Sequence, residues 1–61
     1  MTPDEIKNLR QRLKLTQEAL AHEVETTGPT VNRWEKGHAK PTRRFVSVMR
    51  AMITELEKNG N

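Results

Sequence analysis

The sequence predicts a small all-α domain, and three observations support this prediction. Strand signals are nearly absent, because the chain has no tyrosine and no segment that alternates apolar and polar residues over several positions. Apolar residues instead recur at intervals of three and four, which places them on one face of an α-helix. Threonine, proline and glycine stand at the positions where such helices would begin and end.

Two helices are predicted in the first part of the chain. The segment Thr2-Pro3-Asp4-Glu5 supplies an N-cap hydroxyl, a proline at the first helical position and a capping-box glutamate, so a helix is expected over about residues 3–14. Its apolar residues keep helical spacing: Ile6, Leu9 and Leu13. Thr16 can then cap a short second helix that buries Leu20 and Val24.

A third helix is predicted after a break at Glu25, Thr26 and Thr27. Thr27 can cap it, and its first turn is Gly28-Pro29-Thr30, where proline is tolerated because its missing N–H would have no intrahelical partner. Gly37 is placed to end this helix in the left-handed conformation, which glycine adopts at little cost.

The last predicted helix covers about residues 42–58, with Thr42 as its cap and Asn59-Gly60 as its stop. Six apolar residues follow one another at helical spacing: Phe45, Val48, Met49, Met52, Ile53 and Leu56. We expect three of them to pack inward: Phe45, Val48 and Met52. The other three are available to a dimer or another partner: Met49, Ile53 and Leu56. The alternative is that all six close the core of a monomer.

Length and composition restrict the class of protein. A chain of 61 residues forms at most one domain, predicted over residues 1–61, with a thin core. The absence of cysteine excludes a disulfide framework and a thiolate zinc site. No apolar run approaches the roughly 20 residues of a membrane span. We therefore expect a cytoplasmic protein with no membrane partner and no cofactor.

Catalytic and metal sites are not expected. Ser47, the only serine, has no histidine and acid partner in sight, so the chain is predicted not to be an enzyme. His22 lies one turn from Glu18, but two ligands do not make a metal site, and His38 is in a distant loop.

The charge is distributed unevenly along the chain. The formal net charge is only +3. Residues 36–50 carry five bases and no acid, whereas residues 1–35 carry five bases against six acids. Such a segment attracts polyanions or forms a solvated face.

Residues 15–37, LTQEALAHEVETTGPTVNRWEKG, resemble the helix-turn-helix of the XRE-type or phage-repressor DNA-binding family. The two helices and the short turn have the lengths of that motif, and small Ala21 stands where the family needs close helix packing. Four of the five usual apolar positions are filled: Leu20, Val24, Val31 and Trp34. The resemblance extends over about residues 3–56. It implies a lambda-repressor-like fold, a compact bundle of four to five helices that contains the motif at about residues 16–37.

Two residues depart from the family pattern. Thr26 occupies the fifth apolar position, and Glu25 stands where the family usually places glycine for a positive φ. Either Glu25 adopts that strained conformation or the turn differs slightly.

The resemblance assigns base readout to the outward face of the third helix, opposite Val31 and Trp34, with that helix in the major groove. We expect base contacts from four residues: Arg33, Asn32, Pro29 and Gly28. An arginine can bind guanine O6 and N7 and an asparagine can bind adenine. Gly28 and Pro29 either provide only a helix start, or allow the backbone close to the groove with the proline ring on a thymine methyl.

Contacts to the DNA backbone are expected around this helix. The predicted residues are Gln17, Thr27, Lys36, Lys40, Arg43 and Arg44, whereas Arg50 is expected to be a solvated charge. The family also pairs the positions of Arg10 and Glu35, so a structural ion pair is expected there, with Arg10 also able to approach a phosphate.

The resemblance implies a sequence-specific regulator of transcription that binds double-stranded DNA. We expect a nucleoid-associated repressor that binds inverted-repeat operators as a homodimer. Two alternatives stay open. One is the antitoxin of a toxin–antitoxin pair that regulates its own operon and uses the last helix on a toxin. The other is a helical protein-interaction module without a DNA target.

Overall fold

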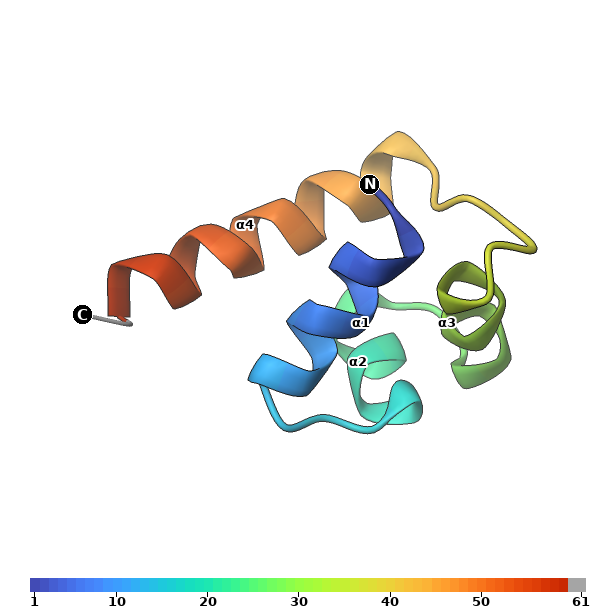
Figure 1. The fold of residues 1–61 in the computed structure, drawn as a ribbon, viewed down its shortest axis with the longest axis horizontal. Coiled ribbons are helices and arrows are strands. Elements are labelled where there is room, and N and C mark those ends of the chain that lie inside the picture. The colour runs from blue at the N-terminus through green and yellow to red at the C-terminus, as the bar shows by residue number, and fades with distance from the viewer. Residues whose placement is uncertain (60–61) are drawn as a thin grey trace.

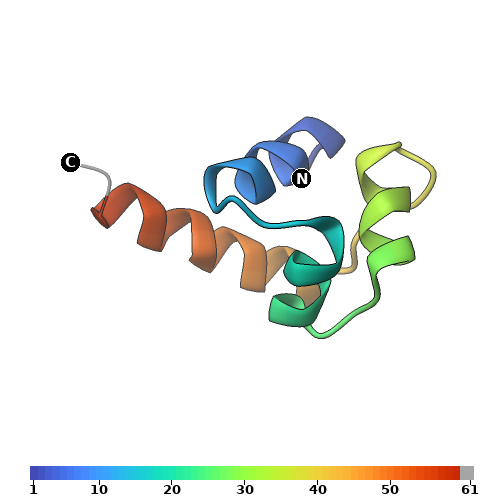
Figure 2. The same ribbon diagram turned by 90° about the horizontal axis from the view of Figure 1, so that it is seen from below.

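The computed structural model describes residues 1–59, and over that range the chain forms four α-helices and no strand. They are α1 (Pro3–Arg12), α2 (Gln17–Val24), α3 (Gly28–Glu35) and α4 (Arg43–Asn59). Helices α1 and α2 pack against α4, and α3 packs against α1 and α2 (Figure 1). The last turns of α4 extend beyond the other helices, as the second view in Figure 2 also shows. The all-α prediction is confirmed. Gly60, the predicted stop of the last helix, lies outside the described residues.

Threonine side chains begin the first three helices, as the sequence predicts. The Glu5 N–H donates to Thr2 Oγ1 at 3.2 Å, and the Thr2 N–H donates to Glu5 Oε1 at 2.8 Å, which completes the capping box. The hydroxyls of Thr16 and Thr27 each accept from the N–H three residues later, at 3.1 and 3.4 Å. Each cap satisfies an N–H group that the helix itself leaves without a partner.

The same three helices end in turns that contain one left-handed residue each, namely Lys14 (φ 58°), Glu25 (φ 66°) and Gly37 (φ 77°). In each turn the N–H of the following residue donates to the carbonyl five residues earlier, at 3.0, 2.8 and 2.9 Å respectively. Gly37 therefore ends α3 as predicted, and Glu25 adopts the strained conformation rather than a different turn. The left-handed Lys14 was not predicted. A side chain in this conformation costs roughly 1 kcal/mol.

The core is built by apolar faces of all four helices. Its buried residues are Ile6, Leu9, Leu20, Ala21, Val24, Val31, Trp34 and Met49. Ala21 is almost completely buried, which fits the predicted need for a small side chain on α2. The Trp34 ring packs against Phe45 with centroids 5.2 Å apart and planes tilted by 54°. Both aromatic residues thus pack in or against the core.

The sequence prediction for α4 is wrong at two neighbouring residues. Met49, expected on a dimer or partner surface, is fully buried, whereas Val48, expected to pack inward, is 38% exposed. Neighbours on a helix are separated by about 100°. Which of the two faces the core therefore depends on how α4 lies against the other helices, and the spacing of apolar residues does not specify this. Ile53 and Leu56 are half-buried and pack against the core.

Candidate nucleic-acid interface

Helix α3 has a buried face and an outward face. Val31 and Trp34 are buried on one side, while Pro29 and Arg33 are exposed on the other. Asn32 is half-buried, at the border between the two faces and nearest to α2. The structure therefore places the residues predicted for base readout along one accessible strip of α3, in which Arg33 is an exposed cation.

A shallow hollow lies on the surface beside the contact between the first turn of α3 and the start of α2. Its volume is about 370 Å³ and it is lined by Gln17, Glu18, Gly28, Pro29 and Asn32. A Cβ atom at Gly28 would lie 2.8 Å from Glu18 Cγ, closer than real Cβ contacts. Glycine at this position therefore lets the first turn of α3 pack against α2, so the residue has a packing function beyond starting the helix. Glu18 was not predicted as part of this surface.

The predicted ion pair between Arg10 and Glu35 is present. Arg10 Nε donates to Glu35 Oε2 at 2.7 Å, and Arg10 Nη2 donates to Glu35 Oε1 at 3.1 Å. The side chains are only 18% and 6% exposed, so this bidentate pair is largely withdrawn from solvent. Arg10 Nη1 also donates to the Leu15 carbonyl at 3.1 Å. The pair joins α1 to the last residue of α3.

Gln17 and Asn32 extend this ion pair toward the outward face. Gln17 Nε2 donates to Glu35 Oε1 at 3.2 Å, and Asn32 Nδ2 donates to Gln17 Oε1 at 3.2 Å. The sequence predicted separate roles for Gln17 and Asn32, one at a phosphate and one at a base. Their direct hydrogen bond was missed, because no sequence pattern places the first residue of α2 beside the middle of α3.

The charge of Glu35 is favoured in the folded chain. Burial raises the pKa of Glu35, but the hydrogen bonds from Arg10 and Gln17, with the Coulombic attraction of Arg10 and Lys7, hold that pKa below its ordinary value. The hydrogen bond to Glu35 raises the pKa of Arg10. Glu35 is therefore a carboxylate, which accepts hydrogen bonds and donates none.

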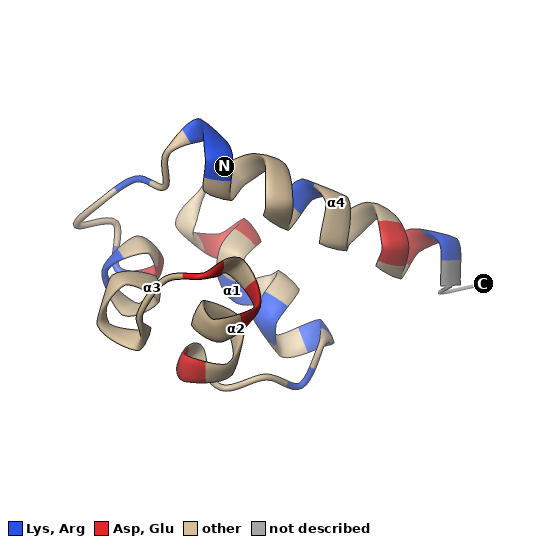
Figure 3. Ribbon diagram, turned by 180° about the vertical axis from the view of Figure 1, so that it is seen from behind, with Lys and Arg blue, Asp and Glu red and all other residues tan. Residues whose placement is uncertain are grey.

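The cations predicted to contact the DNA backbone are all exposed. They are Lys36, Lys40, Arg43 and Arg44. Figure 3 shows basic segments at the end of α3, in the connecting loop and in the first turn of α4, with an acidic segment also at the end of α3, where Glu35 lies. At the other end of α3, Thr27 caps the helix and its Oγ1 lies 2.9 Å from Thr30 Oγ1. Thr30 was not predicted as part of this surface.

Residues 6–49 match the family model described as helix-turn-helix. The chain belongs to the XRE-type helix-turn-helix family. The match covers more than two thirds of the chain, from α1 to the buried Met49 of α4. XRE-type proteins of this family are DNA-binding regulators of transcription rather than enzymes. No curated protein matches the chain.

Within this XRE-type domain, α2, the turn at residues 25–27 and α3 form the helix-turn-helix. Over residues 1–59, His, Asp and Glu side chains form no group of three or more that could hold a metal ion. In the same part of the XRE-type chain, no helix is both long enough and apolar enough to cross a membrane. The accessible strip of α3 and the basic segment that follows it, residues 36–50, are the features of this domain that suit its binding to DNA.

Proposed function

We propose that this chain represses transcription by binding inverted-repeat operators, with α3 of each subunit in the major groove of a half-site. One observation carries this proposal: the exposed strip of α3 continues directly into the acid-free segment 36–50, whose five basic side chains are all exposed. A surface that enters the major groove and is flanked by cations suits binding to a DNA duplex, because phosphate contacts fix the register of the protein and base contacts provide the specificity. Its place of action would be the nucleoid in the cytoplasm, as expected from the sequence.

Base readout is proposed for Arg33 and Asn32. Arg33 is exposed in the last turn of α3, and its guanidinium can bind guanine O6 and N7 with two hydrogen bonds. Asn32 lies one residue earlier, beside the hollow, and its amide has the donor and acceptor that adenine requires. Each half-site would then contain one guanine and one adenine that the chain reads directly.

Gly28 and Pro29 are proposed to bring the backbone of α3 close to the bases. Pro29 is exposed and lines the hollow, so its ring can contact a thymine methyl group. Because neither residue has a side-chain donor, the rest of the specificity would come from DNA shape and from half-site spacing.

Six residues are proposed to hold the DNA backbone. Gln17 and Thr27 lie at the starts of α2 and α3, where free N–H groups of the helices favour a phosphate. The other four are the exposed cations Lys36, Lys40, Arg43 and Arg44. Neutralising four phosphates per subunit gives a slope of log K against log salt of about −3.6.

Selection of duplexes from a random pool, followed by footprinting, tests this function. The selected site should be an inverted repeat with half-sites about 34 Å apart, bound with the salt slope given above. Changing Lys40 and Arg43 to glutamine should bring the slope about 2 units closer to zero. Lys58→Gln, at the far end of α4, is the matched control and should leave the slope unchanged. A slope near zero for the unaltered chain would contradict the proposal and favour a protein-interaction module.

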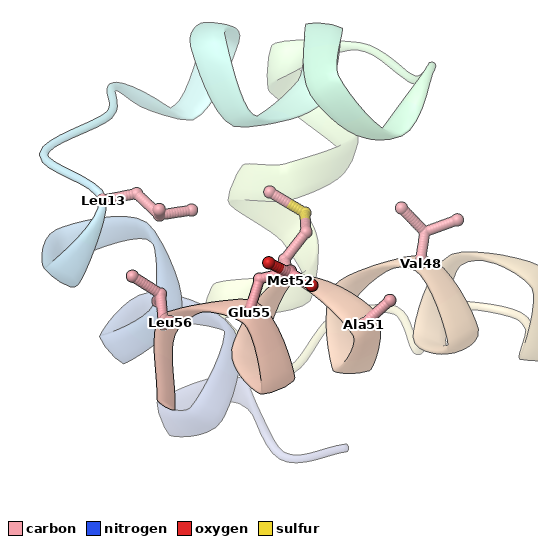
Figure 4. Close-up of a pocket in the computed structure, with 6 residues that line it drawn as sticks. All are labelled: Leu13, Val48, Ala51, Met52, Glu55 and Leu56. Carbon is pink, nitrogen blue, oxygen red and sulfur yellow. The ribbon is translucent and has the colours of Figure 1, made fainter. Parts of the chain in front are cut away.

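The dimer is proposed to form through α4. An apolar groove of about 490 Å³ lies between α4 and the end of α1, and Figure 4 shows its lining: Leu13, Val48, Ala51, Met52, Glu55 and Leu56. Val48 thus replaces Met49 as the apolar contact on the proposed surface. Leu56, predicted for this surface, lines the groove, whereas Ile53 packs against the core and does not line it.

Charge along the groove favours a second copy of the chain as the occupant. Arg44, Val48, Ala51 and Glu55 follow one another at intervals of four, three and four, so they share one edge of α4. If two α4 helices pair antiparallel about a two-fold axis, Arg44 opposes Glu55 and Val48 opposes Ala51. The small Ala51 side chain leaves room for such an approach.

Sedimentation with and without the selected duplex tests this dimer. Two chains should bind each inverted repeat together, without a stable complex of one chain on the duplex. Val48→Asp should let the two half-sites fill independently and more weakly, so that a complex of one chain per duplex accumulates at intermediate concentration. In the free chain at high concentration, Glu55→Arg should weaken association and the double change Arg44→Glu with Glu55→Arg should restore it. Glu57→Arg, on the opposite side of α4, is the control. A monomer on the duplex would leave this groove for another protein, such as a toxin.

A further inference from the structure

We propose that Gln17 sets the direction in which the Asn32 amide faces a base, and that Glu35 sets the direction of Gln17. The inference rests on the proposed function, because it concerns how α3 reads DNA. It gives Gln17 a second role, as a positioning residue for the readout of adenine, in addition to any contact with a phosphate.

The direction of each group follows from which atoms can donate. Arg10 only donates and the ionised Glu35 only accepts, so Gln17 must present its Nε2 to Glu35, as observed at 3.2 Å. The Gln17 Oε1 atom is then left as an acceptor on the other side of the amide. A neutral acid at position 35 would not impose this direction.

The same reasoning fixes Asn32. Because Gln17 offers an acceptor, Asn32 must present its Nδ2, and the two atoms lie 3.2 Å apart. A flipped Asn32 amide would place two acceptor oxygens against each other. The observed direction leaves the Oδ1 atom and the second N–H of Asn32 available to a ligand.

An acceptor and a donor on one amide match the N6 amino group and the N7 atom of adenine. Asn32 and Gln17 line the same hollow as Pro29, so a base pair that reaches Asn32 also reaches the proline ring. An amide whose direction is set before binding loses less freedom when it binds. The hydrogen-bonded series Arg10, Glu35, Gln17 and Asn32 thus prepares an adenine-reading group on α3.

The first test uses the free chain and needs no DNA. Gln17→Met keeps the length of the side chain but removes the donor and the acceptor. In ¹⁵N-labelled protein, the side-chain amide signals of Asn32 should move toward those of Asn8, an exposed asparagine on α1 that serves as reference. Gln11→Met, at an exposed glutamine of α1, is the matched control and should leave the Asn32 signals unchanged. Unchanged Asn32 signals in Gln17→Met would overturn the proposal.

The second test measures base preference on the selected duplex. Asn32→Ala should reduce the preference for adenine at one position roughly 5- to 150-fold. Gln17→Met should reduce the preference for adenine at the same position by about 3-fold or more. It should also weaken binding to duplexes of every sequence. Arg43→Gln, which removes a proposed phosphate contact, should weaken binding to all sequences evenly. If Gln17→Met weakens binding to all sequences by the same factor, Gln17 does not position Asn32. If no duplex is bound at all, the proposed function fails, whereas the amide signals still report whether Gln17 holds Asn32.

Discussion

Arg10 and Glu35 face each other through two parallel hydrogen bonds, with Nε 2.7 Å from Oε2 and Nη2 3.1 Å from Oε1. The third nitrogen of the same guanidinium donates to the carbonyl of Leu15. One side chain therefore connects α1, the segment before α2 and the end of α3. In a chain with a small apolar core, this ion pair contributes to the stability of the packing of α3 against the rest of the domain.

Removing either partner of this pair should destabilise the fold. Arg10→Met or Glu35→Gln leaves a largely buried group without its partner, at a cost of about 2–4 kcal/mol. For a domain of this size each kcal/mol lowers the melting temperature by roughly 4–8 °C. Thermal melts followed by circular dichroism measure the change, with Arg12→Met and Glu23→Gln, both exposed, as controls.

A double variant distinguishes the cost of losing the ion pair from the cost of leaving one buried charge without a partner. Arg10→Met with Glu35→Met should melt above either single variant, since no buried charge remains unpaired. Melting of the single variants within about one degree of the unaltered chain would show that the pair contributes as little as an exposed one.

The pair formed by Arg10 and Glu35 should also make the stability of the fold depend on pH. Because the pKa of Glu35 is lowered on folding, its contribution is complete above its ordinary value of 4.5 and is lost as the pH falls through the lower folded value. The difference in melting temperature between the unaltered chain and Glu35→Gln should therefore narrow below about pH 4.5. The pKa of Glu5 is lowered as well, by hydrogen bonds with Thr2, so Glu5→Gln is the comparison variant. A difference that stays constant down to pH 2 would contradict the proposed linkage.

Glycine at position 25 should stabilise the chain. Glu25 ends α2 with φ 66° and ψ 48°, a conformation that glycine adopts without strain. Glu25→Gly should raise the free energy of unfolding by about 0.5–1 kcal/mol, the strain relieved less the extra freedom gained by the unfolded chain. Glu23→Gly, two residues earlier and inside the helix, should lower it by about 1 kcal/mol. Urea unfolding of both variants measures the two effects, and a lower midpoint for Glu25→Gly would contradict the argument from strain.

The Pro29 contact can be tested on the DNA as well as on the protein. Replacing the contacted thymine by uracil removes one methyl group, and should weaken binding about 4-fold if that group is buried against the proline ring. In Pro29→Ala the same replacement should have little effect. Equal losses for the two proteins, measured by titration at one salt concentration, would exclude the methyl contact.

Much of the fold was predictable because helix ends are determined locally. The caps at Thr2, Thr16 and Thr27 and the stop at Gly37 depend on a few neighbouring residues, and all four lie where the sequence places them. The strip formed by Pro29 and Arg33 follows from helical periodicity alone once Val31 and Trp34 are recognised as buried.

The remaining features depend on distances between helices, which local patterns do not contain. The exchange of Val48 and Met49 follows from the rotation of α4, and the bond between Gln17 and Asn32 follows from the crossing of α2 and α3. The left-handed Lys14 has no local signal either, because lysine does not favour that conformation.

The close approach of Gly28 to Glu18 bears on attempts to redirect this domain to new operators. Any base-contacting residue introduced at position 28 has a Cβ atom, and the Glu18 side chain already fills the space that this atom needs. Because Glu18 is exposed, it can be replaced by a shorter residue without loss of core packing. Libraries that vary α3 alone would therefore select against most residues at position 28 for steric reasons, whatever bases they recognise. Varying positions 18 and 28 together removes that bias and makes the first turn of α3 available for design.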